Sequence, residues 1–234
     1  MRRILGLGSL LLLLGSGLLS QTAPDQGFFE DEAAGLEVKT FPLAIDRLAE
    51  KENCYVAWLP GSGQSLVIDP GAPQAEILEF IRARRLNVLA ILNTHGHADH
   101  CAGDCFLAAG LSVPVYLHRA DLAMASRVAG AKCPITPYPD DRRLVLGDWE
   151  IDVIPTPGHT PGSVCLRIGE TLFSGDTLFA GAIGKADGRA DLRREVQNIR
   201  RFLLTLPPAT RVFPGHGPAT TIGAEKVFNP YIAQ

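Results

Sequence analysis

The sequence predicts a single layered α/β domain, and three observations support this fold class. The chain has 234 residues, 46% of them hydrophobic and 20% charged, which is enough for one domain with a substantial core. From about residue 27 onward, strand-like apolar runs alternate with amphipathic segments, and no long linker or repeat divides them. Glycine and proline turn signals separate the runs. A disordered or fibrous chain is thereby excluded.

The first 20 residues differ from the rest of the chain. Two arginines precede an apolar run from Ile4 to Leu19, which four glycines interrupt. This layout is typical of an export signal, and the run is short for a membrane-spanning helix. We therefore expect residues 1–23 to be a signal peptide and 27–234 the working domain. The expected location is periplasmic or secreted, with an uncleaved N-terminal anchor as the alternative.

Apolar runs bounded by turn residues predict nine strands. Their expected ranges are 36–43, 54–59, 65–69, 88–93, 114–117, 149–155, 163–168, 171–174 and 211–214. Helical periodicity predicts helices over 75–86 and 191–206, and a further helix is expected over 119–128 with His118 as its cap or packing residue. The first half of the domain is expected to end near residue 135 and the second to begin near residue 143.

Charge excludes one class of partner. The chain has 22 Lys and Arg residues against 25 Asp and Glu residues, with no basic run, so no nucleic-acid partner is expected. Removal of residues 1–20 takes away two arginines and no acid, which changes the net charge from −3 to −5. We expect a small-molecule substrate, drawn to a locally positive site, and membrane contact only through an uncleaved N-terminus. The sequence predicts no particular oligomeric state.

The chemistry is concentrated in a few strand-end segments. Thr94-His95-Gly96-His97-Ala98-Asp99-His100 directly follows a buried strand, and its four imidazole and carboxylate side chains are ligands for zinc or similar divalent ions. Their small spacers allow the side chains to converge. Three more candidates also follow strands: His159, Asp176 and His216.

This pattern resembles the metallo-β-lactamase superfamily over about residues 36–230, beginning with Asp69 in a strand-end Asp-Pro-Gly. The resemblance implies an αββα sandwich with two metal ions at one edge. It implies one ion on His95, His97 and His159, a second on Asp99, His100 and His216, and Asp176 bridging both. Asp69 is then expected to orient a ligand, with a simple turn as the alternative.

The charges of such a site favour hydrolysis. Two divalent ions and two carboxylates leave a net charge of about +2, so a bridging water loses a proton readily and is expected to attack a carbonyl carbon as hydroxide. One metal polarises the carbonyl oxygen. Asp99 is expected to accept a proton late in the reaction. We expect zinc, although the ligand set also accepts iron or manganese.

An aspartate at the bridging position is similar to glyoxalase II and its relatives, so a thioester of a small-molecule thiol is the expected substrate. Residues 175–191 and 214–231 are similar to short glyoxalase II-like thioesterases. Lys185 falls where that family places a basic residue toward the thiol's carboxylate, with a solvated surface lysine as the alternative. The sequence departs from the longer enzymes at Pro218 and in having no helical domain after His216.

Three alternatives remain. A secreted β-lactamase with only His and Asp ligands shares the 95–100 segment and the export signal. A persulfide dioxygenase resembles the pattern but holds one iron on His95, His159 and Asp176. A metal-binding module without catalysis would be expected to have lost ligands, and all seven are present here.

The five cysteines are odd in number and match no zinc or disulfide scaffold. Cys54 and Cys165 lie in apolar runs and are expected to be core thiols. Cys101 and Cys105 are four residues apart and would meet on a helix, but we do not expect them to form a disulfide. Cys101 is expected either in the core or lining the metal pocket.

Overall fold

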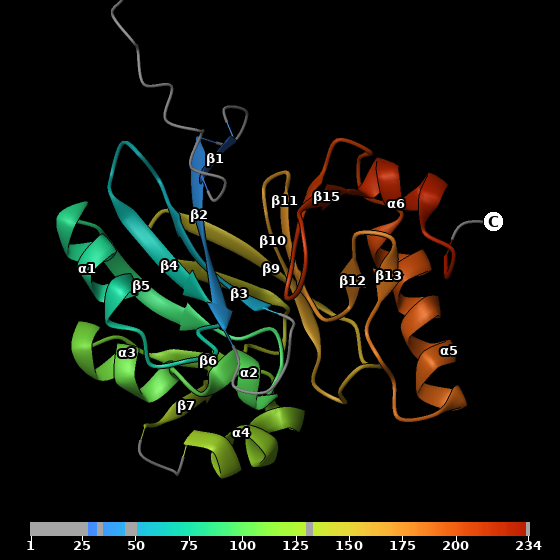
Figure 1. Ribbon diagram of the computed structural model, residues 1–234, viewed down its shortest axis with the longest axis horizontal. Coiled ribbons are helices and arrows are strands. Elements are labelled where there is room, and N and C mark those ends of the chain that lie inside the picture. The colour runs from blue at the N-terminus through green and yellow to red at the C-terminus, as the bar shows by residue number, and fades with distance from the viewer. Residues whose placement is uncertain (1–27, 32–34, 45–50, 130–132, 233–234) are drawn as a thin grey trace, which may run out of the picture.

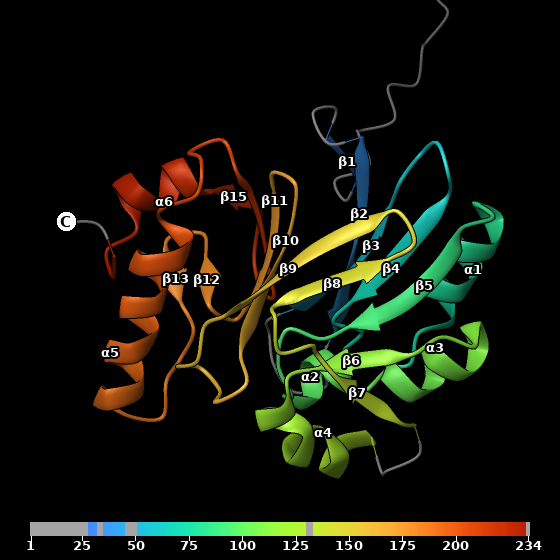
Figure 2. The same ribbon diagram turned by 180° about the vertical axis from the view of Figure 1, so that it is seen from behind.

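Two β-sheets pack face to face, and helices cover the outer face of each sheet (Figures 1 and 2). The computed structural model describes residues 28–31, 35–44, 51–129 and 133–232. This arrangement confirms the predicted single-domain αββα sandwich. The expected signal segment 1–23 lies outside the described residues. No helix in the described ranges is long and apolar enough to span a bilayer.

The first sheet contains seven strands in sequence order. Its first four strands are antiparallel neighbours, and β4 to β7 run parallel. The strands are β1 (Phe28–Asp31), β2 (Leu36–Ala44), β3 (Lys51–Trp58), β4 (Gln64–Ile68), β5 (Asn87–Leu92), β6 (Val115–Leu117) and β7 (Ile135–Pro137). Its helices are α1 (Ala75–Ala83), α2 (Ala98–Cys101), α3 (Asp104–Leu111) and α4 (Leu122–Ala129), the last preceded by a 3₁₀ turn over Arg119–Asp121.

The second sheet contains six strands in the order β15-β14-β11-β10-β9-β8, with only β11 and β14 parallel. The strands are β8 (Arg143–Leu146), β9 (Trp149–Pro155), β10 (Val164–Ile168), β11 (Thr171–Gly175), β14 (Arg211–Pro214) and β15 (Thr220–Thr221). A separate hairpin joins β12 (Leu178–Phe179) to β13 (Ala182–Ile183). Its helices are α5 (Arg189–Asn198), a π-helical turn over Ile199–Leu203, and α6 (Ile222–Phe228).

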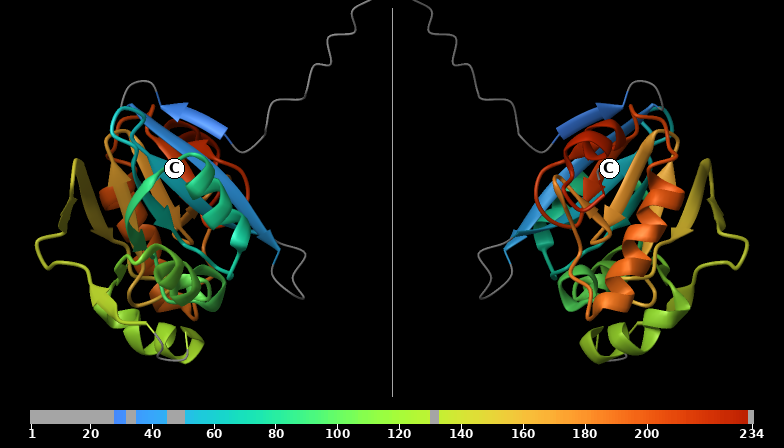
Figure 3. Two further views of the ribbon diagram at one scale, coloured as in Figure 1. Left: turned by 90° about the vertical axis from the view of Figure 1, so that its left-hand side faces the viewer. Right: turned by 90° about the vertical axis from the view of Figure 1, so that its right-hand side faces the viewer.

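Apolar side chains that alternate between the two faces of each strand form three large hydrophobic cores. Side chains such as Tyr55, Leu166 and Phe213 fill the space between the sheets. On the outer face of the first sheet, Val56 packs with residues of α1, and on the outer face of the second sheet Leu172 packs with the π-helical turn. Because both faces of each sheet are covered, the central strands are nearly continuous apolar runs. Figure 3 looks onto the two outer faces, with helix α1 in front of the first sheet in the left view and α5 in front of the second sheet in the right view.

All nine predicted strands are present with small shifts at their ends, and the division near 135–143 coincides with the change of sheet between β7 and β8. The predicted helix over 191–206 differs in detail. It continues past Asn198 as a π-helical turn, and Leu192, expected on the buried face, lies in the first turn and is 39% exposed. His118 caps the 3₁₀ turn as expected, accepting a hydrogen bond from the Ala120 amide at 3.3 Å.

Two of the five cysteines form a disulfide, and the other three are free thiols. Cys105 in α3 forms a disulfide with Cys133, and Cys101 is a buried free thiol. The absence of a Cys101–Cys105 bridge agrees with the sequence analysis, but the pairing with Cys133 was not predicted. Cys101 Sγ instead lies 3.0 Å from the His97 carbonyl oxygen, in a small core cluster with Leu117 and Ala125. Cys54 and Cys165 are core thiols, as expected.

Candidate metal centre

Every candidate site residue lies just beyond the carboxyl end of a strand. The histidine-rich segment 95–100 follows β5, His159 follows β9, and Asp176 follows β11. His216 follows β14, and Asp69 follows β4. These strand ends meet at one edge of the sandwich, so residues as far apart in sequence as 69 and 216 converge. The structure thus brings together all the residues that the sequence analysis grouped.

The first set of candidate ligands is His95, His97 and His159. His97 Nδ1 lies 3.0 Å from His95 Nε2 and 2.9 Å from His159 Nε2. Nitrogens that share a tetrahedral zinc at about 2.0–2.1 Å lie about 3.3 Å apart. The three nitrogens therefore enclose a space suited to one divalent ion.

The second set is Asp99, His100 and His216, whose ligand atoms lie within 4.8 Å of one another. Asp99 Oδ2 is 3.4 Å from His216 Nε2 and 3.9 Å from His100 Nε2. Like the first set, it offers only nitrogen and oxygen donors, which suit zinc, iron or manganese. The residues present therefore fit the two-ion arrangement that the resemblance implies.

Asp176 lies between the two sets. Its Oδ2 is 3.4 Å from His159 Nε2 in the first set and 3.6 Å from His216 Nε2 in the second. Its Oδ1 is 3.3 Å from His100 Nε2, and this buried oxygen has no hydrogen-bond partner among the described residues. A buried carboxylate oxygen without a donor is costly unless a cation compensates it, which suits the bridging position.

The outer nitrogens of the rings fix which atoms face the site. His159 Nδ1 lies 2.9 Å from the Lys185 carbonyl oxygen, and His216 Nδ1 lies 3.2 Å from the Lys51 carbonyl oxygen. A carbonyl oxygen only accepts, so Nδ1 must carry the proton in both rings. Each neutral ring then presents the lone pair of Nε2 to the site, as a metal ligand requires.

Asp69 ties the two ligand sets together. Its carboxylate accepts hydrogen bonds from the Thr94 amide and hydroxyl, both at 2.7 Å, and lies 3.1 Å from His100 Nδ1. The Thr94 hydroxyl oxygen in turn lies 3.1 Å from His95 Nδ1. Because Thr94 donates to Asp69, its oxygen is free to accept from His95. Asp69 thus contacts His100 of the second set directly and His95 of the first set through Thr94.

Replacing Asp69 by asparagine is expected to weaken metal binding about 10- to 100-fold, the usual effect of losing a partner behind a ligand. Asparagine keeps the size of the side chain and tolerates the backbone φ of +50° at this position. Its NH₂ group, however, would face donors instead of accepting from them. Competition with a chromogenic chelator measures the affinity. An unchanged affinity would mean that Asp69 is only a turn residue.

Asp121 is a positioning residue that the sequence analysis missed. Its buried carboxylate accepts hydrogen bonds from the Gly96 amide at 3.0 Å, the Gly162 amide at 2.8 Å and the Thr160 hydroxyl at 2.6 Å. It therefore joins the loop that carries His95 and His97 to the loop that carries His159. The only sequence signal was an aspartate four residues after the end of β6, in the first turn of the predicted 119–128 helix.

Glu52 is another buried acid near the site that the sequence analysis missed, and no sequence signal pointed to it. Its side chain is fully buried in β3, neither carboxylate oxygen has a hydrogen-bond partner in the described ranges, and Oε1 lies 3.9 Å from His100 Nδ1. Burial raises the pKa of Glu52 well above its ordinary value. Asp69, which lies closer, therefore supplies the negative charge behind His100.

The surroundings of the histidines shift their pKa values in opposite directions. Burial and the neighbouring imidazoles lower the pKa of His95 well below its ordinary value. Burial also lowers the pKa of His100, but the carboxylates of Asp176 and Asp69 outweigh it and raise that pKa well above normal. Burial raises the pKa of Asp99, but its contact with His216 and the charge of His100 outweigh it and lower that pKa. A proton on His100 therefore competes with a metal ion for the second set.

A cavity of about 690 Å³ opens over the two sets. Its lining includes His159, Asp176 and His216, together with the exposed lysines Lys51 and Lys185. The volume lies within the range of small-molecule sites. Lys185 thus faces the space where a substrate would bind, as its proposed role requires. We call this cavity the metal chamber.

Comparison with known proteins agrees with this geometry. The family model described as "Metallo-beta-lactamase superfamily" matches residues 49–216, which include every candidate ligand. The chain belongs to the metallo-β-lactamase superfamily. Its superfamily relatives include the hydroxyacylglutathione hydrolase GloC of Haemophilus influenzae, which is 30% identical over 200 residues, 79% of this chain and 94% of GloC.

Two solved structures are similar over most of the chain. The B3 metallo-β-lactamase BLEG-1 superposes with a TM-score of 0.72 at 32% identity, covering 84% of this chain and all of BLEG-1. TTHA1623, crystallised in a di-iron-bound form, superposes with a TM-score of 0.69 at 36% identity, covering 82% of this chain and 99% of TTHA1623. The similar structures thus include a named lactamase and a protein that held two iron ions.

Proposed function

We propose that this protein is a glyoxalase II-like thioesterase that uses two divalent metal ions, most simply zinc, to hydrolyse a small-molecule thioester. The observation that carries the proposal is Asp176, a carboxylate within 3.3–3.6 Å of histidine nitrogens from both ligand sets. The similarity to GloC, whose name gives a thioester as its substrate, supports the reaction class.

His95, His97 and His159 would hold one ion, and Asp99, His100 and His216 the other, with Asp176 shared between them. Ions bound there would lower the pKa of water and polarise the substrate carbonyl. The protein's part is to keep the ligand atoms in place. Asp69 supports His95 and His100, and main-chain carbonyls hold His159 and His216. Asp121 joins the two loops that carry the first set.

Asp99 has a second proposed role, as the acceptor of a proton late in the reaction. Its side chain is 26% exposed, whereas His100 beside it is fully buried. A partly exposed acid can pass a proton to bulk water, which a buried group cannot. Lys185, in the lining of the metal chamber, is proposed to hold an anionic group of the thiol.

A substrate panel tests this function. Purified protein loaded with zinc, iron or manganese is assayed with a thioester, a carbapenem and a persulfide. We expect thioester hydrolysis and loss of activity on chelation. Thioester hydrolysis without lactam hydrolysis would exclude the lactamase alternative, and oxygen consumption with persulfide would instead support a mononuclear iron dioxygenase. Absence of thioester hydrolysis with every metal would contradict the proposal.

A lactamase is the second candidate, and the likeness to BLEG-1 favours it. The two activities share the same metal chemistry, since each begins with attack of water on a carbonyl carbon. They differ in what surrounds the carbonyl. The two lysines in the lining of the metal chamber, Lys51 and Lys185, suit an extended substrate with charged arms, for which a thioester is the better match.

We further propose that the protein is exported. The apolar segment at residues 4–19 supports this, and so does the Cys105–Cys133 disulfide, because such bonds persist in oxidising compartments. Cell fractionation and N-terminal sequencing of the mature protein test the proposal. Recovery in the periplasm or medium, or as a membrane-anchored form facing outward, would support export. Recovery in the cytoplasm with reduced Cys105 and Cys133 would contradict it.

A further inference from the structure

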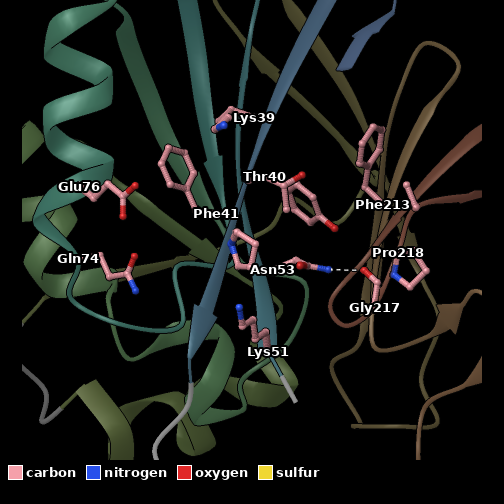
Figure 4. Close-up of a pocket in the computed structure, with 13 residues that line it drawn as sticks. Lys39, Thr40, Phe41, Lys51, Asn53, Gln74, Glu76, Phe213, Gly217 and Pro218 are labelled. Atoms are coloured by element: carbon pink, nitrogen blue, oxygen red, sulfur yellow. Dashed lines mark hydrogen bonds between the residues drawn. The ribbon is translucent and has the colours of Figure 1, made fainter. Parts of the chain in front are cut away.

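A second cavity, of about 730 Å³, lies beside the metal chamber (Figure 4). Strands β2 and β3, the start of α1 and the loop after β14 surround it, and it contains none of the candidate metal ligands. We call it the side chamber. Its volume also lies in the range of small-molecule sites. Neither the ligand sets nor the proposed reaction accounts for it.

The two chambers share a wall. Five residues line both cavities: Pro42, Lys51, Asn53, Gly217 and Pro218. The wall is held firmly, because Asn53 Nδ2 donates to the Gly217 carbonyl at 2.8 Å, the contact drawn as a dashed line in Figure 4, and to the Pro214 carbonyl at 3.1 Å. A ligand that crosses this wall would lie in both chambers at once.

Lys51 links the wall to the metal centre. Its main-chain carbonyl accepts the hydrogen bond from His216 Nδ1, while its exposed side chain lines both chambers and points into the side chamber in Figure 4. Lys185 stands in the same relation to His159 on the other side. One histidine of each ligand set is therefore held by the main-chain carbonyl of a lysine that also lines the metal chamber.

The lining of the side chamber shows which chemistry it suits. Two lysines, Lys39 and Lys51, face one acid, Glu76, so the lining carries a net positive charge. The exposed rings of Pro42 and Pro218 add apolar surface to the lining. A short apolar chain that ends in a carboxylate matches both features, because its stem would pack on the prolines and its end would pair with an ammonium group.

We propose that the side chamber binds one arm of the thioester, that this arm ends in a carboxylate, and that Lys51 on the shared wall selects for it. A thioester has two arms, one on each side of its carbonyl carbon. With the carbonyl at the metal centre, one arm points toward Lys185 and the other crosses the wall past Lys51. This inference rests on the proposed thioesterase function and specifies its substrate as anionic at both ends.

Lys51→Met tests the inference, because methionine keeps the length and apolar stem of the side chain and removes its charge. Four thioesters serve as probes: a carboxylate or its carboxamide at the end of the acyl arm, and the same pair at the end of the thiol arm. Lys51→Met is expected to raise KM about tenfold for one of the two carboxylate thioesters. The KM of the matching carboxamide and the kcat of both thioesters are expected to stay unchanged. The affected pair identifies the arm.

Lys226→Met is the matched control, since Lys226 lies on α6 and lines neither chamber. It is expected to leave all KM values unchanged, and Lys51→Arg is expected to restore most of the preference. Metal content is measured in each variant to show that His216 is still in place. If Lys51→Met leaves both carboxylate preferences intact, or if Lys185→Met removes the preference assigned to Lys51, the inference is wrong.

A binding measurement distinguishes failure of the side-chamber inference from failure of the thioesterase proposal. A non-hydrolysable thioether with a carboxylate at each end is titrated into the wild type and Lys51→Met by calorimetry. Weaker binding to Lys51→Met supports the side chamber even if no thioester is hydrolysed. Equal binding overturns the inference, whatever the activity.

Discussion

Replacing Asp176 by asparagine is expected to lower kcat for thioester hydrolysis by about 10³-fold and to reduce the bound metal below two ions per chain. The three short distances from its oxygens to His100, His159 and His216 place it between both ligand sets. Asparagine keeps the shape but loses the negative charge, and its NH₂ group would point donors at nitrogens that must keep their lone pairs free. A loss of 10³ corresponds to about 4 kcal/mol of barrier, which is within the contribution of metal-ion catalysis.

The measurement is kcat at saturating substrate together with elemental analysis of the same sample. Asp191→Asn is the matched control, because it removes the same charge from a half-exposed aspartate that pairs with Arg194 within α5. It is expected to keep both activity and metal. Wild-type activity in Asp176→Asn would show that the reaction does not depend on a shared carboxylate.

Replacing Gly215 by alanine is expected to lower activity about 10²-fold or more without unfolding the protein. A Cβ atom at this position would lie 2.2 Å from Asp176 Oδ1 and 2.6 Å from His100 Cε1. Both groups would have to move away from the ligand positions, and displacement of about 1 Å in an active site costs roughly 10²-fold in rate. Metal affinity is expected to fall with it.

Gly61→Ala is the control for this second variant. A Cβ atom there meets nothing within 4 Å, and its backbone does not need positive φ. Circular dichroism and urea unfolding establish that both variants fold, and kcat and metal content are then compared. If Gly215→Ala kept full activity, the arrangement of Asp176 and His100 described above would not be the working one.

The sequence allowed the ligands to be predicted because each lies directly after a strand. An apolar run identifies the strand, and the resemblance to the metallo-β-lactamase superfamily grouped residues as far apart as Asp69 and His216. The alternation of apolar runs with amphipathic segments predicted the layered α/β class, and the resemblance implied the αββα sandwich.

What the sequence did not reveal depends on which distant segments meet. Asp121 joins the loops at Gly96 and Thr160, which are 25 and 39 residues away, and nothing local distinguishes it from a helix-start aspartate. The partner of Cys105 lies 28 residues away, past α4. Glu52 sits in an apolar strand where an acid is unexpected. Each of these features depends on which distant segments the fold brings together, and the periodicity of the sequence carries no information about that.

The short elements were also missed, for a local reason. Strands β12, β13 and β15 contain two residues each, too few to show an alternating pattern. They nevertheless shape the site, because Phe179 and Ile183 from the β12–β13 hairpin line the metal chamber. Specificity is therefore less predictable from this sequence than the metal centre itself.

The most direct test of the central claim is to titrate metal-free protein with zinc while measuring thioester hydrolysis. Two ligand sets that share Asp176 predict no activity without metal and an increase that saturates at two ions per chain. Activity in the metal-free protein, or full activity at one ion per chain, would contradict the two-metal account.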